Sequence, residues 1–593
     1  MHKGAATVER VVQICATLVG AVFLLSGVAY LYLGRVPVTA GDFWSIYDFC
    51  LSHTWLESAL LKHNGHSLFF PSFIWLADLR FFHGDQQLLF FVGLALLFIT
   101  ASLLLIPVWR DATVSLTAKT LSTLVVIVGN FWMARASITS SGGLNCINSS
   151  AMTGVALAFL FLPKTPGDWA AMTVILCAGF LASFSFGTGL AIWPTLLLLA
   201  WCLRLQWRSV ALLCLGALAT VVIYALLPPH FKDYVVFQAV LRSLGTAVVA
   251  PLTQLCKLVG SPIFSAAAAW YGGKALRNSD QSLTLALWYG VAGLALTGFA
   301  VIPRMIRRDL GKSGLEITGL GLMIFNILAL ILVVAGRTEY FRLLPSEVLG
   351  PRYLFWSSLF WTGLLLVGIE RAELLRWGRW PILLLVFAIA VFAWPAHYQA
   401  WFSSKYAQFE YEKSATALIN GVVDAPQSIG GIHPLDLKRI LAQVARLARQ
   451  LRARRLDMFA DGLQDWIGIS EADLFRGRLK PEALQGRCTV DALLECDNGA
   501  PAARVRGQAL KHGQLVPRTL VIIDPTGVIC GVARSAPMSP SINRTFYLSK
   551  LGPIIGFLGY IRDYNPQLNY AVRSADDGTL SEEKIPVQIP IRK

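Results

Sequence analysis

The stretch GRVPVTAGDFWSIYDFCLSHTWLESALLKHNGHSLFFPSFIWLADLRFFHGDQ, residues 34–86, is the first long polar segment of the chain. It follows an apolar run at about 10–33 and is dense in acids and histidines. These include Asp42, Asp48, Glu57, His63, His66 and Asp78. Charged side chains are costly inside a bilayer. A membrane protein that acts on polar substrates must therefore place its chemistry in a loop that water reaches, and we interpret 34–86 as an active-site loop.

The composition supports a membrane setting. Hydrophobic residues make up 55% of the 593-residue chain and charged residues 15%, against about 25% charged residues in soluble proteins. Repeated apolar runs of about 20 residues indicate a polytopic membrane protein. The net charge of +16 is explained by cytoplasmic loops and lipid headgroups, so it does not require nucleic acid. The chain has no P-loop, HExxH or GxSxG motif, so ATP hydrolysis and zinc proteolysis have no support.

The apolar pattern predicts eleven spanning helices in a mainly α bundle. We place them at about 10–33, 87–108, 119–137, 148–163, 168–183, 185–203, 208–227, 283–303, 316–336, 353–370 and 380–396. Lys and Arg mark cytoplasmic loops, and RMIRRDLGK (304–312) and ERAELLRWGR (370–379) are strongly basic. This predicts a bacterial inner-membrane protein with a cytoplasmic N-terminus, a retained signal anchor and an extracytoplasmic C-terminal part.

One apolar segment does not fit that count. If 244–264 spanned the membrane, the basic loop 304–312 would lie outside. Pro251, Lys257 and Pro262 also interrupt this segment. We therefore predict that it is re-entrant or interfacial on the outer side.

The C-terminal region, 397–593, changes character and has no spanning run. We expect domain 1–396 to lie in the membrane and 397–593 to form an extracytoplasmic α+β domain. A basic amphipathic helix is predicted at 434–456, either packed on its own domain or bound to anionic headgroups or glycan. Strand-like runs beyond it predict a β-sandwich. Cys488 and Cys496 could form a disulfide if this region lies outside the cytoplasm.

Asp42 is the sharpest acidic candidate in the loop. A carboxylate just above the bilayer can act as a general base on a hydroxyl. An acid before an apolar run is also a good helix N-cap, and the pattern alone favours capping. The nearby Trp44 and Tyr47 could stack on a sugar or anchor at the interface.

Four other side chains are candidates for substrate contact. His63 and His66 lie three residues apart; polar contact with a phosphate or sugar suits them better than metal binding, because no third ligand is evident. Arg337 ends one predicted span and Arg352 begins the next, in GPRY beside Tyr353. Because a short loop joins these antiparallel neighbours, both guanidinium groups can face the same pocket. The planar fork of arginine suits phosphate oxygens. Snorkelling to the interface is the plainer explanation for both arginines.

Four segments resemble the GT-C superfamily of polytopic membrane glycosyltransferases, which use polyprenyl-phosphate-linked sugars. They are DFW at Asp42, HNGHSLFFPSFIWLADLRFFHG in the same loop, SFSFGTGLAIWP at 183–194, and AGR followed by GPRY. The resemblance covers most of 1–396. It implies that Asp42 is the catalytic base. Many members carry two adjacent acids there, whereas this chain has Asp48 six residues after Asp42.

The resemblance implies an inverting transfer of a sugar from a polyprenyl-phosphate carrier. The acceptor would be a hydroxyl of a cell-envelope glycan, lipid or protein on the outer face. Arg352 and Arg337 would bind the lipid phosphate, and a divalent metal ion is the one cofactor that the resemblance suggests. Two alternatives stay open. One is a lipid or solute transporter, which usually places ionisable residues near the midplane. The other is a periplasmic glycan polymerase with a lipid-diphosphate donor.

Overall fold

A computed structural model describes most of the chain as two compact units. The described residues are 2–36, 38–60, 62–162, 168–228, 249–270, 280–308, 310, 313–375, 379–422, 424, 437–481, 483–511, 518–536 and 556–589. The first unit contains Met1–Arg35, Thr54–Trp75 and Leu89–Phe402; the second contains Val36–His53, Leu76–Leu88 and Ser403–Lys593. The contact boundary at Phe402 lies close to the predicted boundary at 396. Two pieces of the polar loop, Val36–His53 and Leu76–Leu88, belong to the unit of the C-terminal region, which no local pattern predicted.

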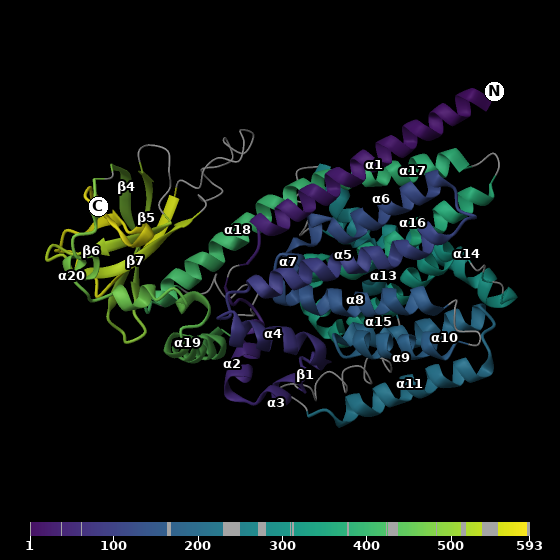
Figure 1. The fold of residues 1–593 in the computed structure, drawn as a ribbon, viewed down its shortest axis with the longest axis horizontal. Coiled ribbons are helices and arrows are strands. Elements are labelled where there is room, and N and C mark those ends of the chain that lie inside the picture. The colour runs from purple at the N-terminus through teal and green to yellow at the C-terminus, as the bar shows by residue number, and fades with distance from the viewer. Residues whose placement is uncertain are drawn as a thin grey trace. The chain divides into compact units, whose positions relative to one another are not determined.

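The first unit is a bundle of long apolar helices (Figure 1). Its main helices are α1 (His2–Leu33), α5 (Gln87–Arg110), α6 (Leu116–Phe131), α8 (Gly142–Phe161), α9 (Trp169–Ser183), α10 (Ile192–Cys202), α11 (Trp207–Leu226), α13 (Val249–Trp270), α14 (Asp280–Arg307), α15 (Gly314–Leu343), α16 (Leu354–Leu374), α17 (Arg379–Phe392) and the start of α18 (Trp394–Ile419). Short helical turns join them: α3 (Trp55–Ala59), η1 (Met133–Arg135), α7 (Ala136–Thr139), η3 (Gly187–Ala191), η4 (Pro345–Leu349) and η5 (Pro351–Tyr353). Helix α4 (Phe69–Phe81) contributes to both units.

Nine helices among the described residues are long and apolar enough to cross a membrane. They coincide with nine of the predicted spans, so the multi-pass prediction is confirmed while the count of eleven is not. The other two predictions correspond to the shorter apolar helices Trp169–Ser183 and Gly187–Cys202. At about 1.5 Å per residue, helices of this length fall short of a hydrocarbon core about 30 Å thick.

The basic loops of the first unit meet at one end of the bundle. The Arg204 guanidinium donates hydrogen bonds to the carbonyls of Arg307 and Arg308. The backbone N–H of Ser115 donates to Glu373 at 3.0 Å. These contacts join loops for which the sequence predicted a common side. The direction of the bundle in a membrane stays a prediction.

The interrupted segment 244–264 is helical wherever it is described. Residues 244–248 lie outside the described residues, and the rest belongs to α13, which contains Pro262 without breaking. Helix α13 packs against α14 so closely that a Cβ on Gly260 would meet the carbonyl oxygen of Ala286 at 1.9 Å. It is not among the nine candidate spans. Its re-entrant or interfacial placement stays a prediction.

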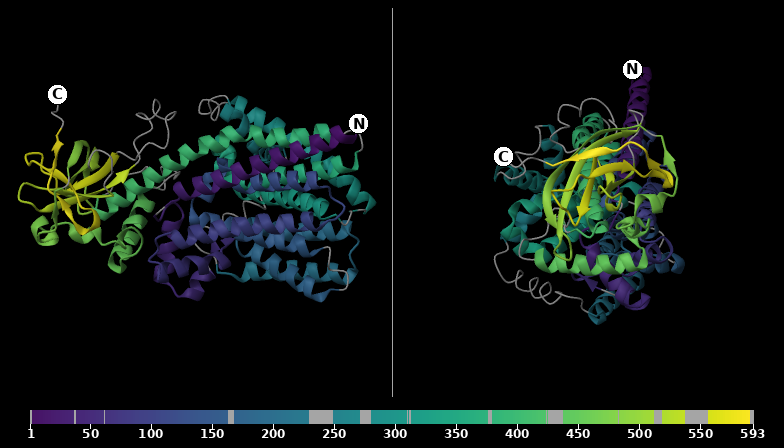
Figure 2. Two further views of the ribbon diagram at one scale, coloured as in Figure 1. Left: turned by 45° about the horizontal axis from the view of Figure 1, so that its top comes forward. Right: turned by 90° about the vertical axis from the view of Figure 1, so that its left-hand side faces the viewer.

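The C-terminal part of the second unit is built on a closed barrel (Figure 2). The strand order is β11-β4-β5-β8-β7-β6-β9. The strands are β4 (Leu484–Glu495), β5 (Pro501–Lys511), β6 (Thr519–Ile523), β7 (Ile529–Ala536), β8 (Gly556–Arg562), β9 (Ala571–Ser574) and β11 (Ile585–Gln588); the short β3 (Leu479–Lys480) and β10 (Leu580–Ser581) pair separately. The predicted β-sandwich is therefore wrong. The last strand, β11, pairs with both β9 and β4, which joins the two edges that a sandwich would leave open.

The basic helix predicted at 434–456 is α19 (Leu437–Arg454), with residues 434–436 outside the described part. Its apolar face is buried through Val444, Leu447 and Leu451. On the other face Arg446 pairs with Asp48, and Arg454 donates to the carbonyl of Leu51 at 3.0 Å. Helix α19 thus packs on α2 (Phe43–Ser52) within the same unit, which favours the structural interpretation over a headgroup contact.

The predicted disulfide between Cys488 and Cys496 is absent, because both cysteines are free. Cys488 lies within β4, and Cys496 directly follows the end of that strand. An extended strand rises about 3.3 Å per residue, so the two Cα atoms are roughly 25 Å apart, far beyond the limit of about 7 Å for a disulfide.

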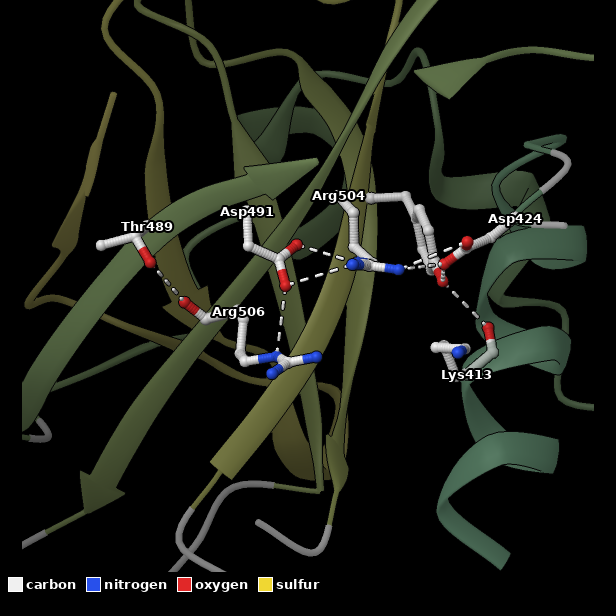
Figure 3. A network of polar contacts seen from close by, with 7 residues as sticks. Lys413, Asp424, Thr489, Asp491, Arg504 and Arg506 are labelled. Atoms are coloured by element: carbon white, nitrogen blue, oxygen red, sulfur yellow. Dashed lines mark hydrogen bonds and ion pairs between the residues drawn. The ribbon is translucent and has the colours of Figure 1, made fainter. Parts of the chain in front are cut away.

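A partly buried polar network joins the C-terminal half of α18 to the barrel (Figure 3). The Arg504 guanidinium pairs with Asp424 at 3.0 Å and with Asp491 at 2.8 Å. Tyr560 donates from its hydroxyl to Asp424 at 2.6 Å, and that hydroxyl also lies 3.2 Å from the carbonyl of Lys413 on α18. The arginine therefore sits between two carboxylates from different segments.

Replacing Arg504 should destabilise the second unit. Arg504→Met leaves both carboxylates without this cation, and losing a hydrogen-bond partner of a charged, partly buried group costs about 1.5–3 kcal/mol. Arg506→Met is the matched control, because its side chain is 44% exposed and exposed pairs contribute under about 1 kcal/mol. Chemical denaturation of each purified variant, monitored with a probe on the barrel, measures the free energy of unfolding. Equal effects of the two variants would contradict this role of Arg504.

Candidate active site

Two arginines and two tyrosines gather where α15 ends and α16 begins. Arg352 donates from Nη2 to the Tyr340 hydroxyl at 2.7 Å, and its guanidinium lies 5.2 Å from the Tyr340 ring and 5.1 Å from the Tyr353 ring. Arg337 lies 5.8 Å from the same two rings. The two arginines that the sequence singled out therefore share one aromatic support, as the short connection between their helices predicted.

The charge of Arg352 is partly balanced by a residue that the sequence analysis missed. Glu347 accepts a hydrogen bond from Arg352 Nη2 at 2.5 Å and another from Tyr340 at 3.1 Å. The side chain of Arg352 remains 37% exposed. The sequence signal for this ion pair is a glutamate five residues before the arginine, with a Gly-Pro turn between them. Because Glu347 fixes one side of the guanidinium, the partly exposed fork is held in a defined orientation.

The local backbone also favours an anion at this position. Pro351 occupies the first position of η5, and α16 follows directly with Tyr353 as its N-cap residue. The Tyr353 side chain makes no capping hydrogen bond. The backbone N–H groups of Tyr353 and Leu354 already donate to the carbonyls of Gly350 and Pro351, so the helix dipole is what makes this N-terminus attractive to phosphate oxygens.

The histidine motif forms a small hairpin in the first unit. Strands β1 (Lys62–His63) and β2 (His66–Ser67) pair antiparallel around a turn at Asn64 and Gly65, both with positive φ. Asn-Gly is the sequence that such a two-residue hairpin turn prefers. His66 lies beside Phe186, with ring centroids 4.6 Å apart.

Gly187 is required for this contact. A Cβ at that position would stand 2.2 Å from Nδ1 of His66. Phe186 in turn stacks on Trp356 of α16, with centroids 6.3 Å apart. Two of the segments that carry the resemblance, HNGH and SFSFG, are thus linked through aromatic contacts to α16, the helix that follows GPRY.

Asp42 belongs to the second unit and is exposed. It occupies the N-cap position of α2, but its φ of −64° and ψ of −18° are helical and its side chain makes no capping hydrogen bond. The capping interpretation, which the sequence pattern favoured, is therefore not supported by the geometry. The role of Asp42 as a base stays a prediction, as does its pairing with Arg352, which lies in the first unit.

Two neighbours of Asp42 are less available than the sequence suggested. Trp44 and Tyr47 are buried, so neither presents a ring face to a sugar in this structure. Asp48 forms an ion pair with Arg446, which satisfies its charge. The substrate-binding roles of Asp48 and Trp44 stay predictions, and this geometry favours structural ones.

Two acids, Asp78 and Asp457, lie buried in the second unit. Asp78 is fully buried beside Tyr47, whose hydroxyl donates to it at 3.4 Å. Asp78 and Arg80 are close enough in sequence to suggest a local ion pair, but none forms, because Arg80 is exposed and Asp78 is buried. Asp457, from the C-terminal region, accepts a hydrogen bond from the Thr39 backbone at 3.0 Å. Sequence reasoning missed Asp457, because 418 residues separate it from Thr39.

Burial raises the pKa of both acids. The pKa of Asp78 rises to about 7 through loss of water, reinforced by the negative charges of Asp85 and Asp457. The pKa of Asp457 rises to about 7 mainly through burial, although the hydrogen bond from Thr39 and the charge of Arg534 oppose this. Neither acid forms an ion pair that would repay the cost of its charge.

This pair predicts that the second unit loses stability at alkaline pH. A carboxyl whose pKa is raised on folding stabilises the fold below its unfolded pKa of about 4. That contribution is lost as the pH rises through about 7, where both acids ionise in the folded state. We expect a lower melting temperature at pH 9 than at pH 6, and a smaller difference in Asp78→Asn. Parallel profiles of melting temperature against pH for the variant and the unchanged chain would contradict this assignment.

A metal site is not formed by the described residues. No group of three or more His, Cys, Asp or Glu side chains among them could hold an ion. The divalent metal that the resemblance suggests stays a prediction, and no step below is assigned to one.

No family model and no curated protein matches the chain. Two solved structures are similar to it. One is the archaeal oligosaccharyltransferase AglB from Archaeoglobus fulgidus in complex with an inhibitory peptide and a dolichol-phosphate, at 14% identity and a TM-score of 0.38, covering 79% of this chain and 67% of that one. The other is the Archaeoglobus fulgidus oligosaccharyltransferase in complex with Zn and sulfate, at 13% identity and a TM-score of 0.34, covering 73% and 61%. These TM-scores carry no argument about activity, so the proposal below rests on the chain's own residues.

Proposed function

We propose that this chain is a membrane glycosyltransferase that moves a sugar from a polyprenyl-phosphate carrier to an acceptor hydroxyl. The observation that carries the proposal is the arginine and tyrosine cluster at the N-terminus of α16. It combines two cations, an aromatic support and a helix N-terminus, which together suit a phosphate. The cluster lies beside the end of a spanning helix, where a lipid carries its headgroup.

The chemistry requires a base and a stabilised leaving group. Asp42 accepts the proton of the acceptor hydroxyl, and the oxygen attacks the anomeric carbon of the sugar. The bond from that carbon to the phosphate oxygen breaks, and polyprenyl phosphate leaves with the electron pair. Arg352 and Arg337 stabilise the negative charge that develops on the phosphate. A single displacement inverts the anomeric centre.

The exposure of Asp42 supports its assignment as the base, because a base must be reachable by the hydroxyl whose proton it accepts. His63, His66 and Tyr353 are proposed to shape the donor site. The acceptor is a hydroxyl of a cell-envelope glycan, lipid or protein on the outer face of a bacterial inner membrane.

The test is a transfer assay with the purified full-length chain in nanodiscs. A panel of polyprenyl-phosphate-linked sugars is supplied with envelope extract as acceptor, and release of polyprenyl phosphate is measured. We expect release with at least one donor and an inverted linkage in the product. Turnover of lipid-diphosphate donors alone would favour a polymerase. Movement of lipid across the bilayer without any release would favour a transporter.

A further inference from the structure

Arg135 is a buried cation without a partner. It ends η1, directly after α6, and its side chain has no solvent exposure. None of its three guanidinium nitrogens makes a hydrogen bond. Its one close charge-related contact among the described residues is the ring of Phe355, 4.7 Å from the guanidinium carbon. A guanidinium has five N–H donors, and enclosing all of them without an acceptor is costly.

The position of Arg135 connects it with the arginine cluster. Helical turn η1 packs against η5, which carries Arg352, and against α16. Phe355 is the second residue of α16 and lies three residues after Arg352 in the sequence. A third arginine therefore approaches the N-terminus of α16 from the α6 side. An anion placed at this N-terminus would supply the acceptor that Arg135 lacks.

An apolar cleft begins one helical turn from Arg135. It is lined by α6, α13, α16 and α17 through Val125, Val128, Gly129, Trp132, Pro262, Ile263, Ala266, Ser358, Trp361, Thr362, Leu365, Val386, Ile389, Ala390, Phe392 and Ala393. Trp132 precedes Arg135 by three residues, and Ser358 follows Phe355 by three. Because α6 and α16 both belong to the spanning set, the cleft lies at the depth of lipid chains.

We infer that Arg135 and this cleft together bind a lipid phosphate, with the chain in the cleft and the phosphate between Arg135, Arg352 and Arg337. The apolar lining fits a hydrocarbon chain, and the unpaired cation of Arg135, three residues after the lining residue Trp132, fits a phosphate monoester. Because Arg135 is fully buried, binding requires its side chain to change rotamer toward Arg352. The identification of this lipid as the sugar carrier rests on the proposed function. The binding site itself does not.

The test is equilibrium binding of farnesyl phosphate to the full-length chain in nanodiscs, compared with farnesol and inorganic phosphate. Arg135→Gln removes the charge and keeps a polar side chain of similar length. We expect it to weaken farnesyl phosphate binding at least about tenfold, the loss that one charge-assisted contact predicts, and to leave farnesol binding unchanged. Ala390→Phe narrows the cleft and should weaken both ligands.

Arg342→Gln is the matched control, because this arginine follows α15's Arg337 by five residues but is 73% exposed. It should bind farnesyl phosphate as the unchanged chain does. The ligand-free melting temperature of Arg135→Gln should equal or exceed that of the unchanged chain, because an unpaired buried charge is removed. A lower melting temperature with unaltered farnesyl phosphate affinity would show a structural role and overturn the inference.

Two further outcomes complete the test. Competition by inorganic phosphate as strong as that by farnesyl phosphate would reduce the site to an anion site and overturn the role of the cleft. If no donor is turned over in the transfer assay while Arg135-dependent binding persists, the proposed function fails and this lipid site stands.

Discussion

Asp42→Asn is expected to abolish sugar transfer while leaving the chain folded. The amide keeps the size and shape of the carboxylate but cannot accept the proton of an acceptor hydroxyl. A positioned general base contributes about 10²–10⁴-fold to rate, so the fall in kcat should lie in this range. Initial rates of polyprenyl phosphate release, measured at saturating donor, give the result.

The control for this prediction is Asp473→Asn. Asp473 is an exposed acid of the same unit, in α20 (Glu471–Phe475). The Asp473→Asn variant should transfer the sugar at the normal rate. Because Asp42 is exposed, its replacement should leave the melting temperature nearly unchanged. Full activity of Asp42→Asn would remove it as the base. A large loss of stability would point to a structural role instead.

The second large effect is expected at Arg352. Arg352→Ala should lower kcat/KM for the lipid-phosphate donor by about 10²–10³-fold, the loss seen when one donor to a developing negative charge is removed. Arg352→Lys keeps the charge but loses the planar fork. A lysine ammonium cannot contact Glu347 and a phosphate oxygen in the geometry of the guanidinium. We therefore expect Arg352→Lys to lower kcat/KM by an intermediate factor of roughly tenfold.

Arg342→Ala separates this effect from the general loss of a positive charge near the loop. Its side chain pairs only locally with Glu339, three residues earlier on the same helix, and both are largely exposed. The kinetic readout is the dependence of rate on donor concentration. An equal reduction in Arg342→Ala and Arg352→Ala would mean that the loop acts by bulk charge, and the assigned phosphate contact would be wrong.

The helices of the first unit were predictable because a bilayer imposes length and apolarity on every span. Nine candidate spans lie where the sequence placed them. Arg337 and Arg352 were expected at one pocket because a short connection joins their helices, and they share Tyr340 and Tyr353. Local rules were sufficient in these cases.

The features that sequence reasoning missed depend on distant contacts. Closure of the barrel requires β11 to pair with β4, with Val587 opposite Cys488, and no local pattern encodes that pairing. Arg135 was hidden at the end of a predicted span, where an arginine is normally explained by snorkelling. Its burial and lack of a partner become visible only when η1 packs against η5.

The measurement that tests the central claim most directly is release of polyprenyl phosphate from a polyprenyl-phosphate-linked sugar by the purified chain, compared between the unchanged protein and Asp42→Asn. The account predicts release that requires an acceptor, yields an inverted linkage and falls by at least about 10²-fold in the variant. Equal release by both proteins, or no release from any donor of this class by a folded chain that binds farnesyl phosphate, would contradict it.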